Sequence, residues 1–289
     1  MTIKEILDQG KKELKEAGIQ EADLDAWLLL ESVTGISRAM YYVRQSEELP
    51  ETQEMQYLEA VARRKKRIPL QHITGEQEFM GLTFQVNHSV LVPRQDTEIL
   101  VEEALKTAVP GMRILDMCTG SGCILISMVQ FMKDKGILPG ACTGTDISGE
   151  ALLVAKENAD RYGLDLTFVQ GNLFENVAGT YDLIVSNPPY IRTSEIACLE
   201  PEVRDHDPKL ALDGKEDGLY FYRKIAESAP EYMAENGCLY FEIGFDQADD
   251  VKKLMEDNGF ARVTVKKDLT GLDRVVYGVY NKAEKLGRN

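Results

Sequence analysis

A regular alternation of strand-like and helix-like segments between residues 113 and 280 most strongly limits how this chain can fold. Such alternation predicts an α/β fold with a doubly wound, mostly parallel sheet. The last two strands, joined by a turn-rich segment, are expected as an antiparallel pair at one edge. We expect the seven strands over residues 113–117, 142–145, 166–169, 182–186, 238–243, 261–266 and 275–280. Helices are expected after Gly122 and over residues 150–162, 220–233 and 247–258.

The first 75 residues follow a different pattern, which predicts a small helical bundle. Thr2 fits the start of a capping box. Ser37 is suited to cap a later helix, and Pro50 fits the first position of another. The single tryptophan, Trp27, is expected in the core of this bundle rather than in a ligand site.

A predicted β-hairpin at residues 79–86 separates the bundle from the alternating segment. We therefore divide the chain into three parts. They are a helical domain (1–75), a hairpin linker (76–92) and a larger α/β domain (93–289).

The composition is that of an ordinary globular protein, with 44% hydrophobic and 28% charged residues. No apolar run reaches the roughly 20 residues needed to span a bilayer, and the charged N-terminus does not resemble a signal peptide. Five cysteines without Cys-x-x-Cys spacing favour free thiols in a reducing cytoplasm. Three scattered histidines suggest no metal cluster. We expect a cytoplasmic protein that uses neither a metal nor a membrane.

The formal net charge of −15 is unevenly distributed. Residues 1–75 carry 11 Lys/Arg against 13 Asp/Glu, and the remainder carries 22 against 35. Proteins bind nucleic acids largely by neutralising phosphates with Lys and Arg. The acidic α/β domain therefore argues against a polynucleotide ligand, and no direct nucleic-acid partner is expected.

Asn187-Pro188-Pro189-Tyr190 follows the predicted strand at 182–186. Neither proline has an N–H for the ladder, so the strand ends there in a stiff loop. Asn187 Oδ and the Pro188 carbonyl can each accept one hydrogen of a planar –NH2 group, with Tyr190 lying on its face. A plain strand-ending turn is the simpler interpretation. We favour the clamp for a planar amino group.

Three further strand ends carry residues suited to a nucleoside ligand. Ligands of open α/β sheets bind beyond the carboxyl ends of strands, where the strand order reverses. The first strand ends in a glycine turn, although Leu125 replaces the third glycine of a dinucleotide site. Asp146 follows the second strand and can accept both hydroxyls of a ribose. Asn172 and Leu173 follow the third and offer an amide acceptor and an apolar wall for adenine.

This order of elements over residues 90–280 resembles the class I S-adenosylmethionine-dependent methyltransferases. Further motifs resemble the protein-(glutamine-N5) methyltransferases of peptide chain release factors, the HemK-type family. The helical N-terminus and the hairpin also match, so the resemblance covers nearly the whole chain. The motifs that carry it are Pro93–Glu98, the glycine turn, Ser186–Ile191, Leu210–Gly214 with Asp217–Leu219, and Phe241–Gly244.

The resemblance implies methylation of the glutamine in the Gly-Gly-Gln motif of bacterial release factors. S-adenosylmethionine would be the methyl donor and S-adenosylhomocysteine its product, and the helical bundle would recognise the protein substrate. The implied cofactor residues are Cys118, Thr119, Gly120, Ser121, Gly122, Asp146, Asn172 and Leu173. The implied substrate residues are Asn187, Pro188, Pro189 and Tyr190, of which Asn187, Pro188 and Tyr190 would be catalytic.

Two residues depart from the family pattern. Cys118 stands where the family usually has glycine, so its backbone must stay in a region open to a β-carbon. Leu173 stands where the adenine contact is often aromatic. Either Phe174 compensates, or adenine is held less tightly. Both departures concern the affinity for the cofactor and not the type of reaction.

The expected chemistry is alignment rather than deprotonation. A carboxamide nitrogen is a poor nucleophile because its lone pair is delocalised into the carbonyl. Two acceptors that hold both N–H groups aim the nitrogen at the methyl group and stabilise the positive charge that develops on it. We therefore expect a clamp formed by Asn187 and Pro188, without a classical general base.

Three alternative functions remain at this stage. The same clamp suits the amino group of adenine, as in an adenine-N6 DNA methyltransferase, which would also need a target-recognition domain and a basic cleft. Methylation of a ribosomal-protein glutamine uses identical chemistry. A non-catalytic S-adenosylmethionine-binding scaffold is the third alternative.

Several residues keep two interpretations. Glu242 is either a further carboxylate of the site or a buried, paired structural acid. The basic run at residues 63–67 either contacts an acidic partner or forms a solvated helix end. The segment at residues 93–98 either covers the substrate, or serves only to cap the next helix, expected at 98–109, through Asp96 or Thr97. Glu98 and Asp213 receive no role.

Overall fold

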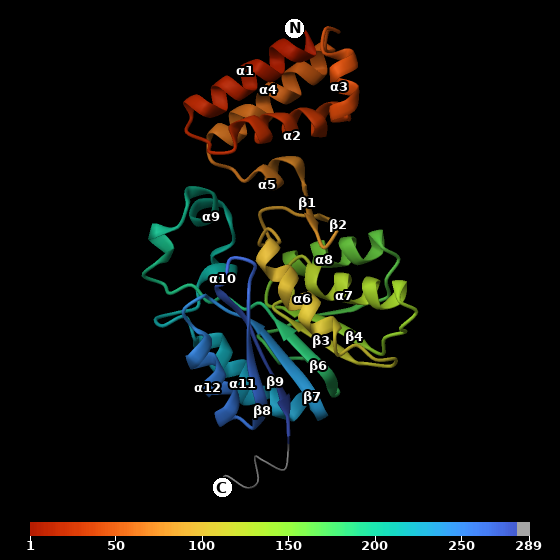
Figure 1. The fold of residues 1–289 in the computed structure, drawn as a ribbon, viewed down its shortest axis with the longest axis vertical. Coiled ribbons are helices and arrows are strands. Elements are labelled where there is room, and N and C mark those ends of the chain that lie inside the picture. Colours follow the sequence, from red (N-terminus) through yellow and green to blue (C-terminus); the bar gives the residue numbers. More distant parts are fainter. Residues whose placement is uncertain (282–289) are drawn as a thin grey trace. The chain divides into compact units, whose positions relative to one another are not determined.

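The computed structural model describes residues 1–281 of the chain. These residues form two compact units. One consists of Met1–Glu76 together with Glu200–His206, and the other of Gln77–Leu199 together with the chain from Asp207 onward. We refer to them as the helical unit and the α/β unit (Figure 1).

The helical unit packs its helices around a core that includes Trp27, Leu29 and Tyr57. Trp27 is 5% exposed, which confirms its predicted place in the core. The capping box at Thr2 and the cap at Ser37 are also confirmed, whereas Pro50 is the N-cap rather than the first helical residue. The helices are α1 (Ile3–Glu16), α2 (Ala22–Thr34), α3 (Arg38–Arg44), α4 (Glu51–Lys65), α5 (Leu70–Thr74) and α9 (Pro201–His206).

Three residues of the basic run at 63–67, at the end of α4, form ion pairs inside the helical unit. Arg64 is buried and pairs with Asp25 at 2.7 Å and with Glu202 at 3.1 Å. Arg67 pairs with the same Glu202 at 3.1 Å, and Lys65 pairs with Glu13 of α1. The prediction of a solvated helix end is therefore wrong for the buried Arg64, whereas Lys65 is exposed. The reason is that acids distant in the sequence fold back onto Arg64.

The α/β unit contains a seven-stranded sheet with the order β5-β4-β3-β6-β7-β9-β8. Its strands are β3 (Ile114–Met117), β4 (Cys142–Asp146), β5 (Thr167–Gln170), β6 (Tyr181–Ser186), β7 (Met233–Glu242), β8 (Phe260–Lys267) and β9 (Asp273–Tyr280). The first five are parallel, and β9 is antiparallel to both β7 and β8. This confirms the predicted doubly wound sheet and its antiparallel edge pair.

Successive residues of β6 show why both faces of the sheet are covered. Leu183 and Val185 belong to one apolar cluster, and Ile184 belongs to the other. A strand that is apolar at every position must be buried on both sides. Helices α6 (Glu98–Leu105), α7 (Cys123–Asp134) and α8 (Gly149–Arg161) cover one face, and α11 (Tyr220–Tyr232) and α12 (Ala248–Asp257) the other (Figure 1).

The remaining elements are short. A two-stranded sheet, β1 (Glu76–Phe79) and β2 (Leu82–Gln85), forms the predicted hairpin with an earlier start. Helix α10 (Lys209–Leu212) and the 3-10 turns η1 (Gln95–Thr97) and η2 (Ile196–Cys198) were not predicted. None of the helices in residues 1–281 has the length and apolarity that crossing a membrane would require.

Several boundaries differ from the predictions, and those of α6, β7 and α11 have a local reason. Helix α6 ends at Leu105 and is not capped by the side chain of Asp96 or Thr97, because η1 precedes it with helical backbone angles. Strand β7 starts at Met233, which pairs with Tyr181 ahead of a register shift. Helix α11 consequently ends at Tyr232.

Candidate active site

The ends of three strands, β3, β4 and β6, meet at one edge of the sheet because of the register at β3. Met117 pairs with Thr145 of β4 on one side and with Ser186 of β6 on the other. The Ser186 hydroxyl also donates to the Met117 carbonyl at 2.7 Å. The residues that follow these three positions, Cys118, Asp146 and Asn187, therefore start their loops at the same level and line one cavity.

The turn after β3 has an unusual backbone. Cys118, Gly120 and Gly122 have φ angles of 62°, 55° and 79°, all in the left-handed region. For Cys118 this is the least favourable of the regions open to a residue with a β-carbon. A β-carbon on Gly120 would meet no atom within 4 Å, whereas one on Gly122 would press against Ile126 at 2.9 Å. Position 120 thus keeps the backbone open towards the cavity.

Asp116 supports this turn from below and was not singled out in the sequence. It is fully buried, and its Oδ2 accepts the Thr119 hydroxyl at 2.6 Å. Burial raises the pKa of Asp116 to about 7. The sequence feature that could have indicated its role is an acid inside the strand Ile114–Met117. A buried carboxyl is costly unless hydrogen bonds or a function compensate for its burial.

Asp146 closes the turn from the neighbouring strand. Its Oδ2 accepts the Gly120 N–H at 3.0 Å, and its Oδ1 accepts the Ser148 N–H at 2.9 Å. Burial raises the pKa of Asp146, although these backbone hydrogen bonds oppose the rise. Each carboxylate oxygen has a second lone pair. Asp146 can therefore still accept hydroxyl groups from a ligand in the cavity.

Leu173 and Asn172 line the cavity beyond β5, as predicted, but Phe174 does not. Phe174 is 8% exposed and stacks on Tyr232 of α11 with ring centroids 4.5 Å apart. The suggestion that Phe174 supplies an aromatic adenine contact is therefore wrong. Leu173 has a φ of 55°, which turns the chain so that the next residue enters the core.

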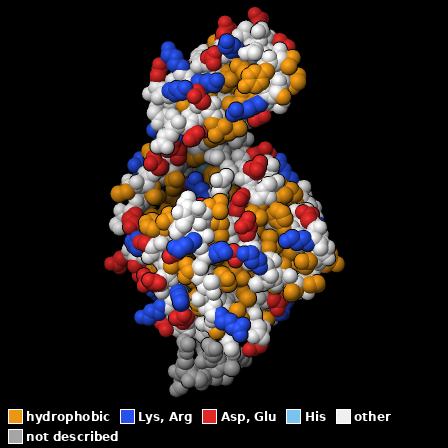
Figure 2. Space-filling model, viewed as in Figure 1, with side chains coloured by type: hydrophobic (Ala, Val, Ile, Leu, Met, Phe, Trp, Pro, Cys, Tyr) orange, Lys and Arg blue, Asp and Glu red, His pale blue; other side chains and the backbone are white. Residues whose placement is uncertain are grey.

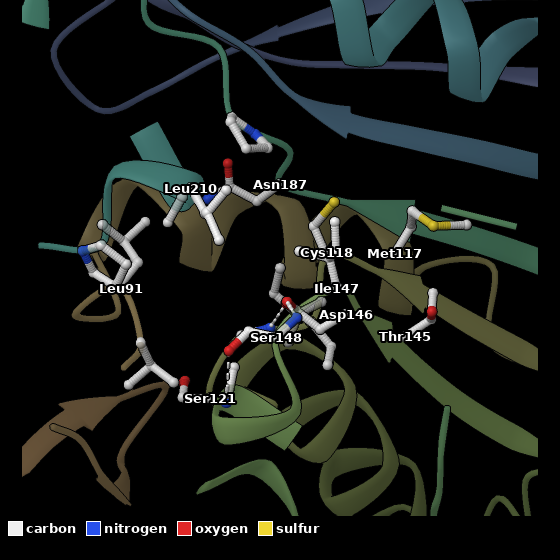
Figure 3. A pocket seen from close by; sticks show the side chains of 18 of the residues that line it. Leu91, Met117, Cys118, Ser121, Thr145, Asp146, Ile147, Ser148, Asn187 and Leu210 are labelled. Atoms are coloured by element: carbon white, nitrogen blue, oxygen red, sulfur yellow. Dashed lines mark hydrogen bonds between the residues drawn. The ribbon is translucent and has the colours of Figure 1, made fainter. Parts of the chain in front are cut away.

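Asn187 stands on the wall of the cavity opposite Asp146 and Ser148 (Figure 3). Its Nδ2 donates to the Thr97 hydroxyl oxygen at 3.3 Å. Pro189 also lines the cavity, whereas Pro188 and Tyr190 do not. Burial raises the pKa of Tyr190, whose hydroxyl points to Glu242 Oε1 at 3.5 Å.

The backbone of the Asn-Pro-Pro-Tyr loop is held by Gln247, a 2% exposed residue. Its Nε2 donates to the carbonyls of Tyr190 at 3.1 Å and Gly218 at 3.3 Å. Its Oε1 accepts the Gly244 N–H at 2.9 Å. A β-carbon at Gly214 would lie 2.7 Å from Tyr190 Cα. Glycine at 214 and 218 thus lets the backbone around residue 190 be packed from two sides.

Glu242 lies behind the loop, at the end of β7, and is 2% exposed. Burial raises the pKa of Glu242 to about 7, while hydrogen bonding by Thr97 and Asn187 opposes that rise. It is not among the residues that line the cavity. Glu242 is therefore a buried acid in contact with the loop rather than a carboxylate that faces a ligand.

The two acids without a predicted role stabilise other loops. Glu98 Oε1 accepts the Met80 N–H at 2.6 Å, and Asp213 accepts the Thr193 hydroxyl at 2.6 Å. Of the sequence-predicted site residues, the cavity brings together Cys118, Thr119, Gly120, Ser121, Asp146, Asn172, Leu173, Asn187 and Pro189. Gly122, Pro188 and Tyr190 lie outside its lining. All five cysteines are free.

The strand order together with these four strand-end elements defines the fold of a class I methyltransferase. Two family models match the chain. One, described as the PrmC N-terminal domain, matches residues 5–75, and the other, the methyltransferase small domain, matches residues 94–200.

Full-length relatives narrow this class to one family. The chain is 42% identical to the release factor glutamine methyltransferase of Geobacter sulfurreducens, over 96% of each chain. It is 40% identical to that of Agrobacterium fabrum, over 95% of this chain and 96% of the relative. The chain belongs to the release factor glutamine methyltransferase family.

Solved structures support the fold. A methyltransferase from Pyrococcus furiosus superimposes with a TM-score of 0.52 at 18% identity, covering 80% of this chain and 100% of the other. A 16S rRNA methyltransferase from T. thermophilus, in complex with AdoMet and guanosine, gives a TM-score of 0.51 at 13% identity. Here the superposition covers 71% of this chain and 50% of the other.

The geometry of Asp146 leads to a prediction for ligand affinity. Asp146→Asn is expected to weaken S-adenosylmethionine binding about 10- to 100-fold, because one charge-assisted hydrogen bond contributes roughly 1.5–3 kcal/mol. Isothermal titration calorimetry measures this directly. Glu150→Gln is a matched control, since this exposed acid of α8 accepts the Ser89 hydroxyl instead. Equal affinities for the Asp146→Asn variant and wild type would contradict the assignment.

Proposed function

We propose that this protein transfers a methyl group from S-adenosylmethionine to the side-chain nitrogen of the glutamine in the Gly-Gly-Gln motif of bacterial release factors. We further propose that it acts in the cytoplasm, without a metal, and that the helical unit recognises the protein substrate. The observation that carries the proposal is the Asn187 amide, held by Thr97 on the wall opposite Asp146. Family membership supports the choice of substrate.

The residues present fit S-adenosylmethionine. Asp146 retains lone pairs for ribose hydroxyls, and the backbone at Gly120 is open to the cavity. Leu173 and Ile147 provide apolar walls for a base, and Asn172 provides an amide. When bound, the cofactor supplies an electrophilic methyl group on a sulfonium. A carboxylate, an open glycine turn and apolar walls are the features that a binding site for such a ligand requires.

Asn187 and Pro188 would act on the glutamine side chain. The Asn187 amide oxygen and the Pro188 carbonyl each accept one N–H, which fixes the orientation of the nitrogen and enriches its electron density. Good orientation of reactants is worth on the order of 7–11 kcal/mol of the barrier. The proton released from the methylated amide needs no buried base, because an amide protonated on nitrogen is a strong acid.

The alternatives differ in substrate and not in chemistry. Adenine in DNA would also present a planar amino group to Asn187. Lys and Arg are interspersed with Asp and Glu on the visible face of the α/β unit (Figure 2). The part of the chain after residue 75 carries 22 Lys/Arg against 35 Asp/Glu, which disfavours phosphate binding. A ribosomal-protein glutamine remains the second candidate, since the clamp would accept it equally well.

A substrate panel tests the proposed function. The protein is incubated with S-adenosylmethionine labelled on its methyl group, and separately with release factor, ribosomal proteins and DNA. Label is expected in the release factor, and mass spectrometry should place it on the glutamine of the Gly-Gly-Gln motif.

Label in ribosomal protein alone would favour the ribosomal-protein glutamine as the substrate. Label in DNA alone would overturn the proposed function. No transfer to any of the three would favour a cofactor-binding scaffold.

The clamp predicts a specific effect of losing the Asn187 amide. Asn187→Ala is expected to lower kcat about 100-fold or more, because it removes a preorganised group that acts on developing charge. S-adenosylmethionine affinity should stay near the wild-type value. Asn258→Ala is the matched control, since the side chain of this asparagine, the C-cap of α12, donates to the Leu254 carbonyl and does not line the cavity. A near-normal kcat for Asn187→Ala would rule out the clamp.

A further inference from the structure

The clamp works only if Asn187 turns its oxygen, and not its NH2, towards the substrate. An amide side chain has an acceptor at one end and donors at the other. Here Nδ2 is occupied by Thr97 at 3.3 Å, and Oδ1 accepts no hydrogen bond within residues 1–281. The contact with Thr97, together with hydrogen bonding to Glu242, therefore sets which end of the amide is free.

Thr97 can hold Nδ2 only while its own hydroxyl proton points elsewhere. A hydroxyl has one proton to donate and two lone pairs to accept with. Thr97 is 3% exposed but is among the residues that line the cavity, so its proton can point into the cavity or to an acceptor of the protein. Thr97, Asn187 and Glu242 form one cluster, because Asn187 Nδ2 donates to Thr97 and hydrogen bonding by both side chains opposes the raised pKa of Glu242. Glu242 is the acid of this cluster that can accept the Thr97 proton.

Glu242 has a free site for such a contact. Its Oε1 is approached by the Tyr190 hydroxyl at 3.5 Å, and its backbone carbonyl accepts the Tyr222 hydroxyl at 2.9 Å. Its buried Oε2 has no partner with good hydrogen-bond geometry within residues 1–281. An orphaned carboxyl oxygen directly behind the clamp is costly unless it is used.

Among residues 1–281, no charged group forms an ion pair with Glu242 within 4 Å. Arg274 of β9 faces it, but this guanidinium is shared between Asp268 at 3.1 Å and Asp96 at 3.2 Å. Asp96 opposes ionisation of Glu242, and Arg274 favours it. The other titratable groups on this side are the hydroxyls of Tyr190 and Tyr222 and the thiol of Cys123.

We propose that Thr97 and Glu242 are positioning residues that turn the oxygen of Asn187 towards the substrate amide. Ionised Glu242 accepts the Thr97 hydroxyl, and Thr97 then accepts Asn187 Nδ2. Protonated Glu242 is a weaker acceptor for the Thr97 hydroxyl, so the Thr97 proton can turn towards Nδ2 and release the amide to rotate. This inference rests on the proposed function, because it assigns the orientation of the same clamp.

The pH dependence follows with a definite sign. Burial places the pKa of Glu242 at about 7, so the carboxyl is protonated below that pH and ionised above it. The competent arrangement requires the ionised form, and kcat is therefore expected to rise as the pH increases through about 7.

The test uses the full-length chain with release factor as the substrate. Thr97→Val removes the acceptor for Nδ2 and is expected to lower kcat about 100-fold, the scale of a small misplacement. The KM for S-adenosylmethionine should not change. Thr97→Ser restores the hydroxyl and should restore most of kcat. Glu242→Gln should abolish the rise of kcat near pH 7, because its amide does not titrate.

Matched controls separate positioning from stability. Thr143 is 7% exposed and also makes one hydrogen bond of 3.3 Å, from Tyr181, so Thr143→Val should leave kcat and its pH profile unchanged. Glu103, another buried acid at 7% exposure, pairs with Lys106 and with Lys266 of β8. Glu103→Gln is the control for Glu242→Gln. Thermal unfolding shows whether all variants fold.

A second readout does not depend on catalysis. The side-chain amide signals of Asn187 in NMR spectra should shift with a midpoint near pH 7 in the wild type and stay constant in Glu242→Gln. Wild-type kcat for Thr97→Val, or a pH-dependent Asn187 signal in Glu242→Gln, would overturn the inference. If the wild type does not methylate release factor, the proposed function fails, and the NMR signals alone decide the orientation.

Discussion

The parallel pairing of β3 with both β4 and β6 is the constraint on which the rest of the site depends. Met117 is in register with Thr145 and Ser186, so three loops leave the sheet at one level. The glycine turn, Asp146 and Asn187 meet only because of this register. A slip of one residue would turn their side chains to the other face of the sheet. The proposed clamp and two of the proposed cofactor elements, the glycine turn and Asp146, are therefore positioned by the same three strands.

The Asn-Pro-Pro-Tyr loop is rigid for two reasons. Its prolines restrict the backbone, and tertiary contacts hold what the prolines leave free. Gln247 holds the Tyr190 carbonyl from α12, and Gly214 allows the backbone to approach from another side. Rigid placement matters because a clamp acts by alignment, and alignment is lost with shifts of about 1 Å. The position of the loop at the site thus depends on elements that are distant in the sequence.

The fold and the cavity-lining residues carry strong local signals in the sequence, whereas their supporting contacts do not. Alternating strands and helices predicted the sheet, and strand-end Asp146 and Asn187 were placed on one cavity. Thr97, by contrast, looked like a helix cap and instead accepts Asn187 Nδ2, 90 residues away. Phe174 was a candidate for the adenine contact in the sequence, but in the structure its ring packs on Tyr232. Such pairings depend on tertiary packing, and no spacing along the chain encodes them.

The central claim is that Asn187 and the Pro188 carbonyl hold the glutamine amide. A crystal structure of the protein with S-adenosylhomocysteine and a Gly-Gly-Gln peptide tests it most directly. The account predicts that the glutamine nitrogen lies about 3 Å from both Asn187 Oδ1 and the Pro188 carbonyl, with Asn187 Nδ2 still on Thr97. A glutamine amide held by other groups, or an Asn187 that turns its NH2 towards it, would contradict the account.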